Sequence, residues 1–403
     1  MTTSGRITTS GPAAGTAATA AGGAPVSPAT ATDSGPGRHN RRAGLIGLAV
    51  ALVAAGVLLA LPSAQTDPVA EPGLSTLADV WPDAPLLDVP ATLPEGPAYS
   101  PAYLLDDGGS VGTGPSADGG SLRLLVRSAS ADIRELRSLP MATQPQYGGV
   151  VVVGDQLAWA ETTSDGQGRG RTELWLADLR RSGEPPRRLT ADTGDVVFFN
   201  SEYDLVLVDG ALHWVAVAPG EQTATEIRSV PVGGGAVAVG TEPGAWAMSA
   251  WPWLVSAGTG ESGPIQLRDR SARRVVDVDA AGTELVSCSP VWCRVLVLGS
   301  AGPGRIDLMR PDGSDRQPVA TGSVTASIID VAVLDRFEVL SRSDAQRTAT
   351  GTQQLLLHDL EGKRTVLVAE GIGMVLYRGG LLWWSAGSAD SPAWKALDLR
   401  ALS

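Results

Sequence analysis

A pair of apolar segments recurs along this chain roughly every 40 to 50 residues, and this repeat constrains the possible folds more than any other feature. The first segment of each pair is rich in aromatic and aliphatic side chains, and a second apolar segment follows each copy. Copies of the first segment begin at Leu157, Leu212, Trp253, Trp292, Phe337 and Leu381, which are 55, 41, 39, 45 and 44 residues apart. Two segments that keep their order at such a period indicate repeated units that bury apolar surface against their neighbours.

The repeated segments have the pattern of β-strands. Runs of five to eight residues rich in Val, Leu, Ile and Trp alternate with clusters of Gly, Asp, Ser and Pro, without a long stretch of helical spacing. In five of the six copies the second segment ends at an acidic residue, where an Asx turn would reverse the chain into the next strand. These residues are Asp178, Asp269, Asp312, Asp359 and Asp398. The pattern predicts an all-β protein built from the blades of a β-propeller.

On these residues the chain resembles the WD-repeat and TolB-like β-propellers. The shared features are an aromatic-rich second strand, an Asp-terminated third strand and the turn RPDGSD, Arg310–Asp315. The resemblance covers roughly residues 75–403 and also extends to membrane-anchored propellers of unknown role from high-GC actinobacteria. No repeat contains the full Gly-His and Trp-Asp pair of a WD repeat, so the resemblance implies a fold and no activity.

The last repeat is one strand short, and the segment before the first repeat contains a strand candidate without a partner. An earlier unit, Ala98–Pro140, raises the number of predicted blades to seven, with six as the alternative. The last repeat lacks a fourth strand, whereas the apolar run within Val80–Pro94 has no local partner. We therefore predict that Val80–Pro94 pairs with the strand near Trp394–Leu399 and closes the ring.

A membrane anchor is predicted before the repeats. Ala43–Leu61 has no charged side chain, and its 19 residues would form a helix about 28 Å long, which matches the hydrocarbon core of a bilayer. Arg38, Arg41 and Arg42 precede it, whereas Pro62–Leu122 contains neither Lys nor Arg. The positive-inside bias predicts a single-pass protein with a cytoplasmic N-terminus and an extracytoplasmic propeller.

The flanking segments complete this predicted domain organisation. Residues 1–42, dominated by Thr, Ser, Ala, Gly and Pro, are predicted to be a disordered cytoplasmic tail, and residues 62–74 a linker. A cleaved signal peptide is the alternative to an anchor. Its best cleavage site, after Ala64, has Pro62 where a small residue is preferred, and no Cys follows for lipid attachment.

Charge and cysteine content limit the partners of the exported part. Without the four Arg and one Asp of the first 61 residues, the chain retains 27 basic and 42 acidic residues, a net charge of −15. Nucleic acid and anionic lipid are therefore excluded as expected partners. Cys288 and Cys293 are predicted to form a hairpin disulfide in an oxidising compartment, with a redox-active pair as the alternative. His213 and His358 lie in different repeats, so we predict neither a metal site nor a cofactor.

Two stretches combine aromatic and polar side chains near the predicted inner strands, and they are the candidate ligand-binding residues. The alternative role for their rings is packing between blades. The first stretch contributes Asn200, Glu202, Tyr203 and Asp204, and the second contributes Trp246, Trp251 and Trp253.

Catalytic residues are not predicted. Convergent carboxylates, metal-binding His and Asp-box motifs do not recur at the blade period. The sequence favours a non-enzymatic binding or scaffold module for an envelope protein, peptide or glycan. The alternatives are a cell-wall carbohydrate hydrolase or lyase that uses carboxylates at the channel, and a sensor coupled to the tail.

Overall fold

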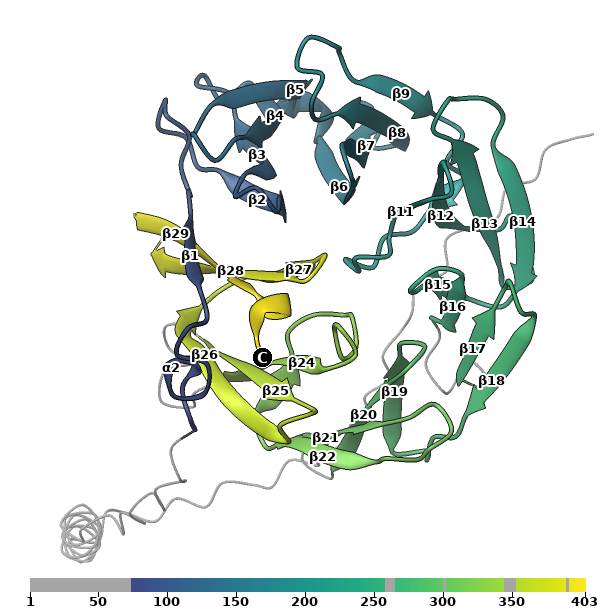
Figure 1. The fold of residues 1–403 in the computed structure, drawn as a ribbon. Coiled ribbons are helices and arrows are strands. Elements are labelled where there is room, and N and C mark those ends of the chain that lie inside the picture. The colour runs from purple at the N-terminus through teal and green to yellow at the C-terminus, as the bar shows by residue number, and fades with distance from the viewer. Residues whose placement is uncertain (1–73, 258–264, 300–301, 344–352, 389–390) are drawn as a thin grey trace, which may run out of the picture. The chain divides into compact units, whose positions relative to one another are not determined.

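The structure is a computed structural model that describes residues 74–403 except 258–264, 300–301, 344–352 and 389–390. Seven antiparallel sheets follow one another around a ring, which confirms the predicted all-β propeller with seven rather than six blades (Figure 1). The predicted tail, the span Ala43–Leu61 and nearly all of the linker lie outside the described residues. Within the described part, no helix is long and apolar enough to cross a membrane.

Blades 1 to 3 occupy the first half of the ring. A 3₁₀ turn, η1 (Met141–Thr143), connects blades 1 and 2. Blade 1 comprises β2 (Ser100–Leu104), β3 (Ser110–Pro115), β4 (Ser121–Arg127) and β5 (Ile133–Pro140). Blade 2 comprises β6 (Gln146–Val153), β7 (Gln156–Ser164), β8 (Gly170–Asp178) and β9 (Arg187–Thr190). Blade 3 comprises β10 (Asp195–Val196), β11 (Val206–Val208), β12 (Ala211–Val217), β13 (Ala224–Pro231) and β14 (Ala238–Pro243).

Blades 4 to 7 complete the ring, and the 3₁₀ turn η4 (Leu399–Ala401) follows the last strand. Blade 4 comprises β15 (Trp246–Met248), β16 (Trp253–Ser256), β17 (Ile265–Asp269) and β18 (Arg274–Val278). Blade 5 comprises β19 (Glu284–Cys288), β20 (Cys293–Gly299), β21 (Gly302–Met309) and β22 (Gln317–Thr321). Blade 6 comprises β23 (Val324–Ala326), β24 (Phe337–Ser343), β25 (Gln353–Asp359) and β26 (Arg364–Ile372). Blade 7 comprises β27 (Val375–Arg378), β28 (Leu381–Ser388), β29 (Ser391–Asp398) and β1 (Leu86–Val89).

The seventh blade is completed by a strand from the N-terminal side of the propeller, as predicted. β1 pairs antiparallel with β29, so that Leu86 lies opposite Leu397 and Val89 lies opposite Trp394. In Figure 1 the two strands lie side by side although they differ in colour from purple to yellow. The short helix α2 (Leu77–Val80) precedes β1 and buries Leu77 in the core shared by blades 6 and 7. Closure therefore joins the two ends of the described chain through backbone pairing and core packing.

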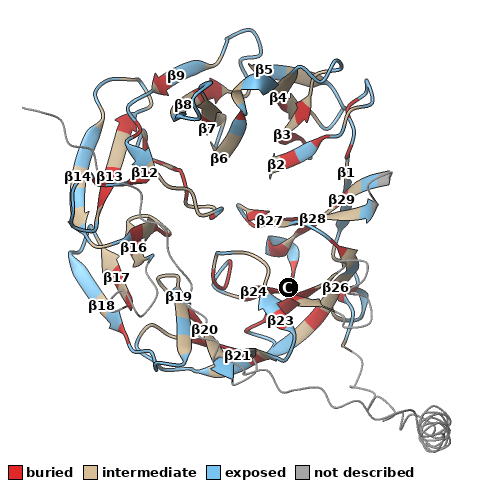
Figure 2. Ribbon diagram, turned by 180° about the vertical axis from the view of Figure 1, so that it is seen from behind, coloured by how far each residue is buried: buried red, intermediate tan, exposed pale blue. Residues whose placement is uncertain are grey.

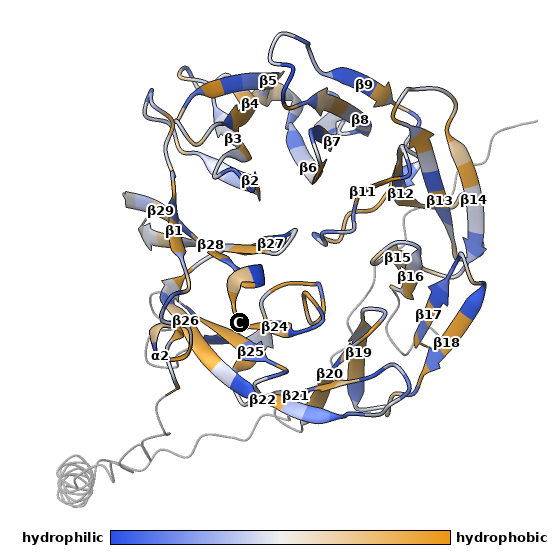
Figure 3. Cartoon of the chain, in the orientation of Figure 1, coloured by the Kyte–Doolittle hydropathy of each residue, from blue (hydrophilic) through white to orange (hydrophobic). Residues whose placement is uncertain are grey.

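The apolar core lies within and between the blades, on their second and third strands. Trp159, Trp214 and Trp383 on the second strands of blades 2, 3 and 7 are fully buried. The outermost strands β14 and β18 are mainly exposed (Figure 2). Hydrophobic and hydrophilic positions interleave along strands such as β13 and β18 (Figure 3). This placement explains why the first segment of each repeat, which forms the second strand of its blade, is rich in aromatic residues, because large rings fill the space between neighbouring sheets.

The acidic residues at the ends of the third strands, or just beyond the end in the case of Asp312, form the predicted Asx turns. In each case a carboxylate oxygen accepts a hydrogen bond from the backbone N–H two residues later, at 2.9 to 3.2 Å. These acceptors are Asp178, Asp269, Asp312, Asp359 and Asp398. The first four turns reverse the chain from the third strand to the fourth strand of their blades, whereas the turn at Asp398 leads from β29 into η4.

The two cysteines form the predicted hairpin disulfide. Cys288 ends β19, Cys293 begins β20, and the two residues are directly opposite each other in the strand register. A four-residue turn connects them, and the Ser289 hydroxyl donates a hydrogen bond to the Trp292 carbonyl across it. A cross-link that closes so short a loop contributes about 2 kcal/mol on a chain-entropy model.

Candidate functional site

A loop interrupts the inner strand of blade 3, another loop follows the inner strand of blade 6, and both enter the central channel. In blade 3, residues 197–205 separate β10 from β11. In blade 6, residues 327–336 connect β23 to β24. Figure 1 shows the first loop reaching towards the tip of β27 and the second curling inside the ring. We refer to them as the 197–205 loop and the 327–336 loop.

The two loops contact each other across the channel. The Ser201 hydroxyl donates to Asp330 Oδ1 at 2.5 Å, and the Glu202 backbone N–H donates to Asp330 Oδ2 at 3.1 Å. The turn between β27 and β28 joins them, because Gly379 N–H donates to Glu202 Oε2 at 3.1 Å. Glu202 and Asp330 thus connect blade 3 with blades 6 and 7, which lie far from it in sequence.

A buried ion pair fixes the 327–336 loop. Arg294 on β20 pairs with Glu338 on β24, and both side chains are buried. The Arg294 guanidinium also donates to the carbonyls of Ile328 at 3.2 Å and Asp330 at 2.7 Å. Glu338 Oε2 accepts from the Ala332 backbone N–H at 2.9 Å. The pair therefore holds the backbone on both sides of Asp330.

The backbone of both loops includes residues in the left-handed region. Ala332, Leu334 and Asp335 have φ of 48°, 56° and 55°, and Asn200 has φ of 63°. Side chains other than glycine adopt this conformation at an energetic cost, and such residues cluster at functional sites. In the 197–205 loop, Asp204 offsets part of this cost because its Oδ1 accepts from the Phe199 N–H at 2.8 Å.

A cavity of about 700 Å³ lies between these loops and the inner strands of blades 4 and 5. Trp251 and Trp253 of blade 4 and Tyr377 of blade 7 contribute aromatic walls. The charged residues that line it are Glu202, Asp330 and Asp335, and none of the described lining residues is Lys, Arg or His. The cavity therefore combines apolar walls with a negative charge.

Burial changes the acid–base properties of this region. The pKa of Glu202 is raised by burial and by the nearby Asp330 carboxylate. The pKa of Asp330 is raised by burial, although hydrogen bonds from Ser201 and Glu202 oppose the shift. Burial also raises the pKa of Asp204 to about 6 and raises the pKa of Tyr203 and Tyr377. Each carboxyl group binds its proton more strongly than it would in water.

The predicted ligand residues divide into three groups. Glu202, Tyr203, Trp251 and Trp253 line the cavity, so the two sequence stretches do meet. Asn200 and Asp204 belong to the 197–205 loop, where Asp204 is buried. Trp246 lies in the core of blades 3 and 4, and its Nε1 donates to the Pro243 carbonyl at 2.8 Å. A ligand role for these residues stays a prediction.

Ring contacts limit how the tryptophans could bind a ligand. The Trp251 ring packs against His213 with their centroids 4.1 Å apart, and Arg270 lies 5.6 Å from the same ring. Arg274 lies 5.5 Å from the Trp253 ring. Since part of each ring already contacts the protein, these rings serve as walls rather than as free stacking platforms.

Sequence reasoning missed Ser201, Asp330 and Tyr377. The longest interval between repeats, 55 residues, precedes blade 3 and contains the 197–205 loop, while the 45-residue interval before blade 6 contains the 327–336 loop. The lengths of these two intervals were the sequence signal for the two loops. They indicate that residues are inserted, but not that the two loops meet.

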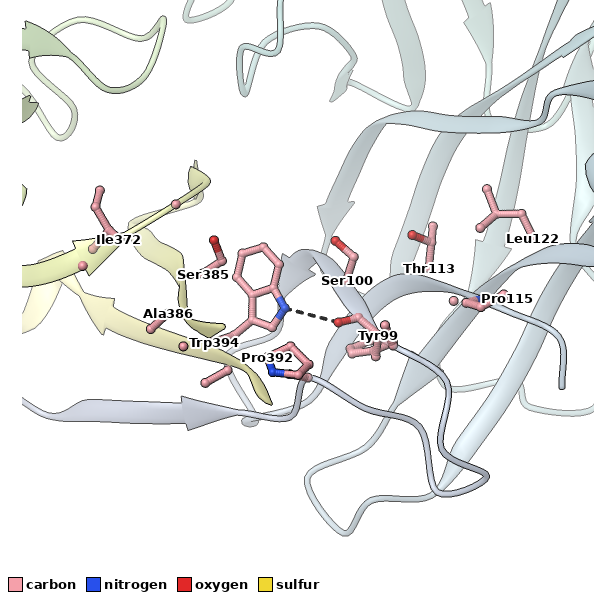
Figure 4. A pocket seen from close by; sticks show the side chains of 17 residues that line it. Tyr99, Ser100, Thr113, Pro115, Leu122, Ile372, Ser385, Ala386, Pro392 and Trp394 are labelled. Atoms are coloured by element: carbon pink, nitrogen blue, oxygen red, sulfur yellow. Dashed lines mark hydrogen bonds between the residues drawn. The ribbon is translucent and has the colours of Figure 1, made fainter. Parts of the chain in front are cut away.

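A second cavity of about 540 Å³ lies at the closure between blades 7 and 1. Figure 4 shows Trp394 and Tyr99 in its wall, joined by a hydrogen bond of 3.2 Å from Trp394 Nε1 to the Tyr99 carbonyl. Its described lining residues carry no charge, and small residues such as Gly114 and Ala393 contribute much of the wall. We therefore place the candidate site in the central cavity.

Among the described residues, no group of three or more His, Cys, Asp or Glu is arranged to hold a metal ion. No protein-family model and no curated protein matches the sequence.

Solved structures that resemble this chain include a β-propeller domain. The propeller domain of the Trilobed protease from Pyrococcus furiosus is 11% identical with a TM-score of 0.43, over 63% of this chain and 83% of that chain. A puromycin-hydrolysing peptidase of Mycobacterium tuberculosis is 15% identical with a TM-score of 0.47, over 76% of this chain and 52% of that chain. An oligogalacturonate lyase in complex with manganese is 14% identical with a TM-score of 0.44, over 79% of this chain and 85% of that chain. This chain thus spans about half of the peptidase, and the likeness concerns the fold alone.

Proposed function

We propose that this propeller is a non-enzymatic binding module for an envelope protein, peptide or glycan, and that the central cavity is its ligand site. The observation that supports this proposal most is that a loop within the inner strand of blade 3 and a loop after the inner strand of blade 6 line a cavity of about 700 Å³. That volume lies within the range of ligand sites, which combine apolar walls with a few polar groups. A buried ion pair holds the 327–336 loop, and both loops include strained backbone, features typical of pre-formed binding sites.

A cavity-filling variant tests this proposal. Ser287 is exposed on β19 and lines the cavity, so Ser287→Trp should occupy it without disturbing the core. Gln222→Trp places the same ring on the exposed turn between β12 and β13 and is the matched control. We expect members of a panel of synthetic peptides and envelope oligosaccharides to bind the parent and Gln222→Trp in calorimetry. Binding should be lost in Ser287→Trp at an unchanged melting temperature, and equal affinity in all three proteins would refute the cavity as the site.

A carbohydrate hydrolase or lyase is the second candidate, and the observation that favours it is the meeting of Glu202 and Asp330 in the cavity. A carboxyl group whose pKa is raised can serve as a general acid beside a second carboxylate. Release of reducing ends from cell-wall polysaccharide by the parent, and its loss in Glu202→Gln, would favour this candidate. Binding without product release would favour the binding module.

We further propose that Ala43–Leu61 anchors the protein in the cell membrane with the propeller outside the cytoplasm. The support is the Arg content before this segment and the disulfide, which an oxidising compartment would maintain. A reporter that works only after export, fused after Ser403, is expected to be active. Protease added to intact protoplasts should remove the propeller and spare the tail. A fusion that works only in the cytoplasm would contradict this topology.

A further inference from the structure

The central cavity is lined by acidic side chains and, among the described residues, by no basic ones. Glu202 and Asp330 reach it from opposite sides of the channel, and Asp335 is the third acid in its wall. Among the described residues, no Lys, Arg or His forms an ion pair with Glu202 or Asp330. Their hydrogen-bond partners are neutral: the Ser201 and Tyr203 side chains and the backbone N–H groups of Glu202 and Gly379.

Arg378 and Arg294, the cations that act electrostatically on this pair, bond to other groups. Arg378 donates to the carbonyls of Asn200 at 3.5 Å and Tyr377 at 2.6 Å. Arg294 is paired with Glu338. Both arginines lower the pKa of Asp330, and Arg378 lowers that of Glu202, but burial outweighs them at both sites.

The remaining titratable groups around the pair add no positive charge. Tyr203 and Tyr377 keep their protons because burial raises the pKa of each phenol. Asp204, whose pKa is raised to about 6, adds a further acid. Two partly buried carboxylates without a cation are mutually repulsive, and an arriving cation would stabilise both ionised forms.

The cavity also presents apolar surface at positions that face solvent. Leu285, Ile329 and Leu334 line it, although 44%, 48% and 45% of their surfaces are exposed. Soluble proteins bury most such side chains, and exposed apolar residues that surround polar groups mark binding surfaces. A ligand that fits here therefore carries apolar surface next to its charge.

We propose that the central cavity recognises an organic cation, an ammonium or guanidinium group carried by an apolar chain, with Glu202 and Asp330 as its counter-charges. The inference rests on the cavity being the ligand site. It excludes acidic peptides and uronate-rich glycans as ligands, because their carboxylates would meet Glu202 and Asp330 with like charge.

Matched peptides test the charge requirement with the full chain. The probes are the pentapeptides Ac-Ala-Leu-Xaa-Leu-Ala-NH2, in which Xaa is Arg, Lys, citrulline or Glu, together with hexylammonium. Citrulline has nearly the shape of Arg without its charge. Calorimetry should give an affinity for the Arg or Lys peptide that is about tenfold or more above that for citrulline. That advantage should diminish as the pH falls through the raised pKa values of Glu202 and Asp330, because protonation removes the counter-charge.

Isosteric variants assign the effect to the two carboxylates. Glu202→Gln and Asp330→Asn each retain an oxygen that can accept the loop hydrogen bonds, so the fold should persist. Each should reduce the preference for Arg over citrulline by about tenfold while leaving citrulline binding unchanged. Glu221→Gln, at an exposed position on the β12–β13 turn, removes the same charge elsewhere and should have no effect.

The outcomes separate this inference from the proposed function. If hexylammonium binds as tightly as the Arg peptide, the cation site is supported and its ligands are small amines. If only the Arg and Lys peptides bind, the site is supported and its ligand is a basic side chain of a peptide. Equal affinity for Arg and citrulline, tighter binding of the Glu peptide, or binding of oligosaccharides alone would overturn the cation inference and leave the binding module standing. If no peptide, amine or oligosaccharide binds, both fail.

Discussion

Deletion of residues 75–94 is expected to abolish folding of the propeller or to lower its melting temperature severely. The deletion removes β1, which supplies the fourth strand of blade 7, and exposes the edge of β29. It also removes Leu77 and Trp81 from the core that they share with Phe337 and Leu397. The loss of one large buried side chain costs about 3–5 kcal/mol, and the whole stability of a domain is about 5–15 kcal/mol.

The control is a deletion just before this segment that removes no described strand. Removing residues 65–73 shortens the predicted linker and leaves α2 and β1 in place. Differential scanning calorimetry and light scattering of both deletions against the parent chain provide the measurement. Should the two deletions melt alike at the parent temperature, the ring would not depend on β1 for its closure.

Breaking the Arg294–Glu338 pair should be the most destabilising single charge removal in the channel. Both side chains are buried, so Glu338→Gln leaves Arg294 as an unpaired buried cation and weakens the support of Ala332. Removal of one partner of a buried pair costs about 3–5 kcal/mol. Denaturant unfolding, with the change in midpoint at constant slope, measures that cost.

Two further variants distinguish an uncompensated charge from lost packing. The double variant Arg294→Met with Glu338→Leu removes both charges and should recover much of the stability, because apolar replacement of a buried pair is often near neutral. Glu361→Gln breaks the exposed pair with Arg336 and should change the unfolding free energy by less than about 1 kcal/mol. A Glu338→Gln protein as stable as Glu361→Gln would contradict the structural role of the pair.

The features that could be predicted from the sequence are those set by local pattern and by the repeat. Asp178 and Asp359 end their strands in Asx turns because a short carboxylate bonds the backbone two residues on, whatever the remainder of the fold. Ring closure could be predicted because the last repeat lacked a fourth strand and the run within Val80–Pro94 lacked a partner. Pairing of β1 with β29 supplies both. The cysteines were assignable because only four residues lie between them and a hairpin places them opposite each other.

The site could not be predicted as a whole, because its contacts join residues far apart in sequence. Ser201 and Asp330 are 129 residues apart, and nothing local to Asp330 indicates that it accepts hydrogen bonds from blade 3. Composition also failed to separate the roles of neighbouring aromatic residues. Trp246 on β15 is buried in the core, whereas Trp253 on the neighbouring strand β16 lines the cavity.

Hydrogen–deuterium exchange on the full chain tests the central claim, that ligands occupy the channel cavity, most directly. The ligand is whichever panel member binds most tightly. The account predicts slower exchange in the 197–205 and 327–336 loops, including the Glu202 and Ala332 amides, and no change in outer strands such as β14 and β18. Protection confined to the outer strands or to blades 1 and 2, with both loops unchanged, would contradict it.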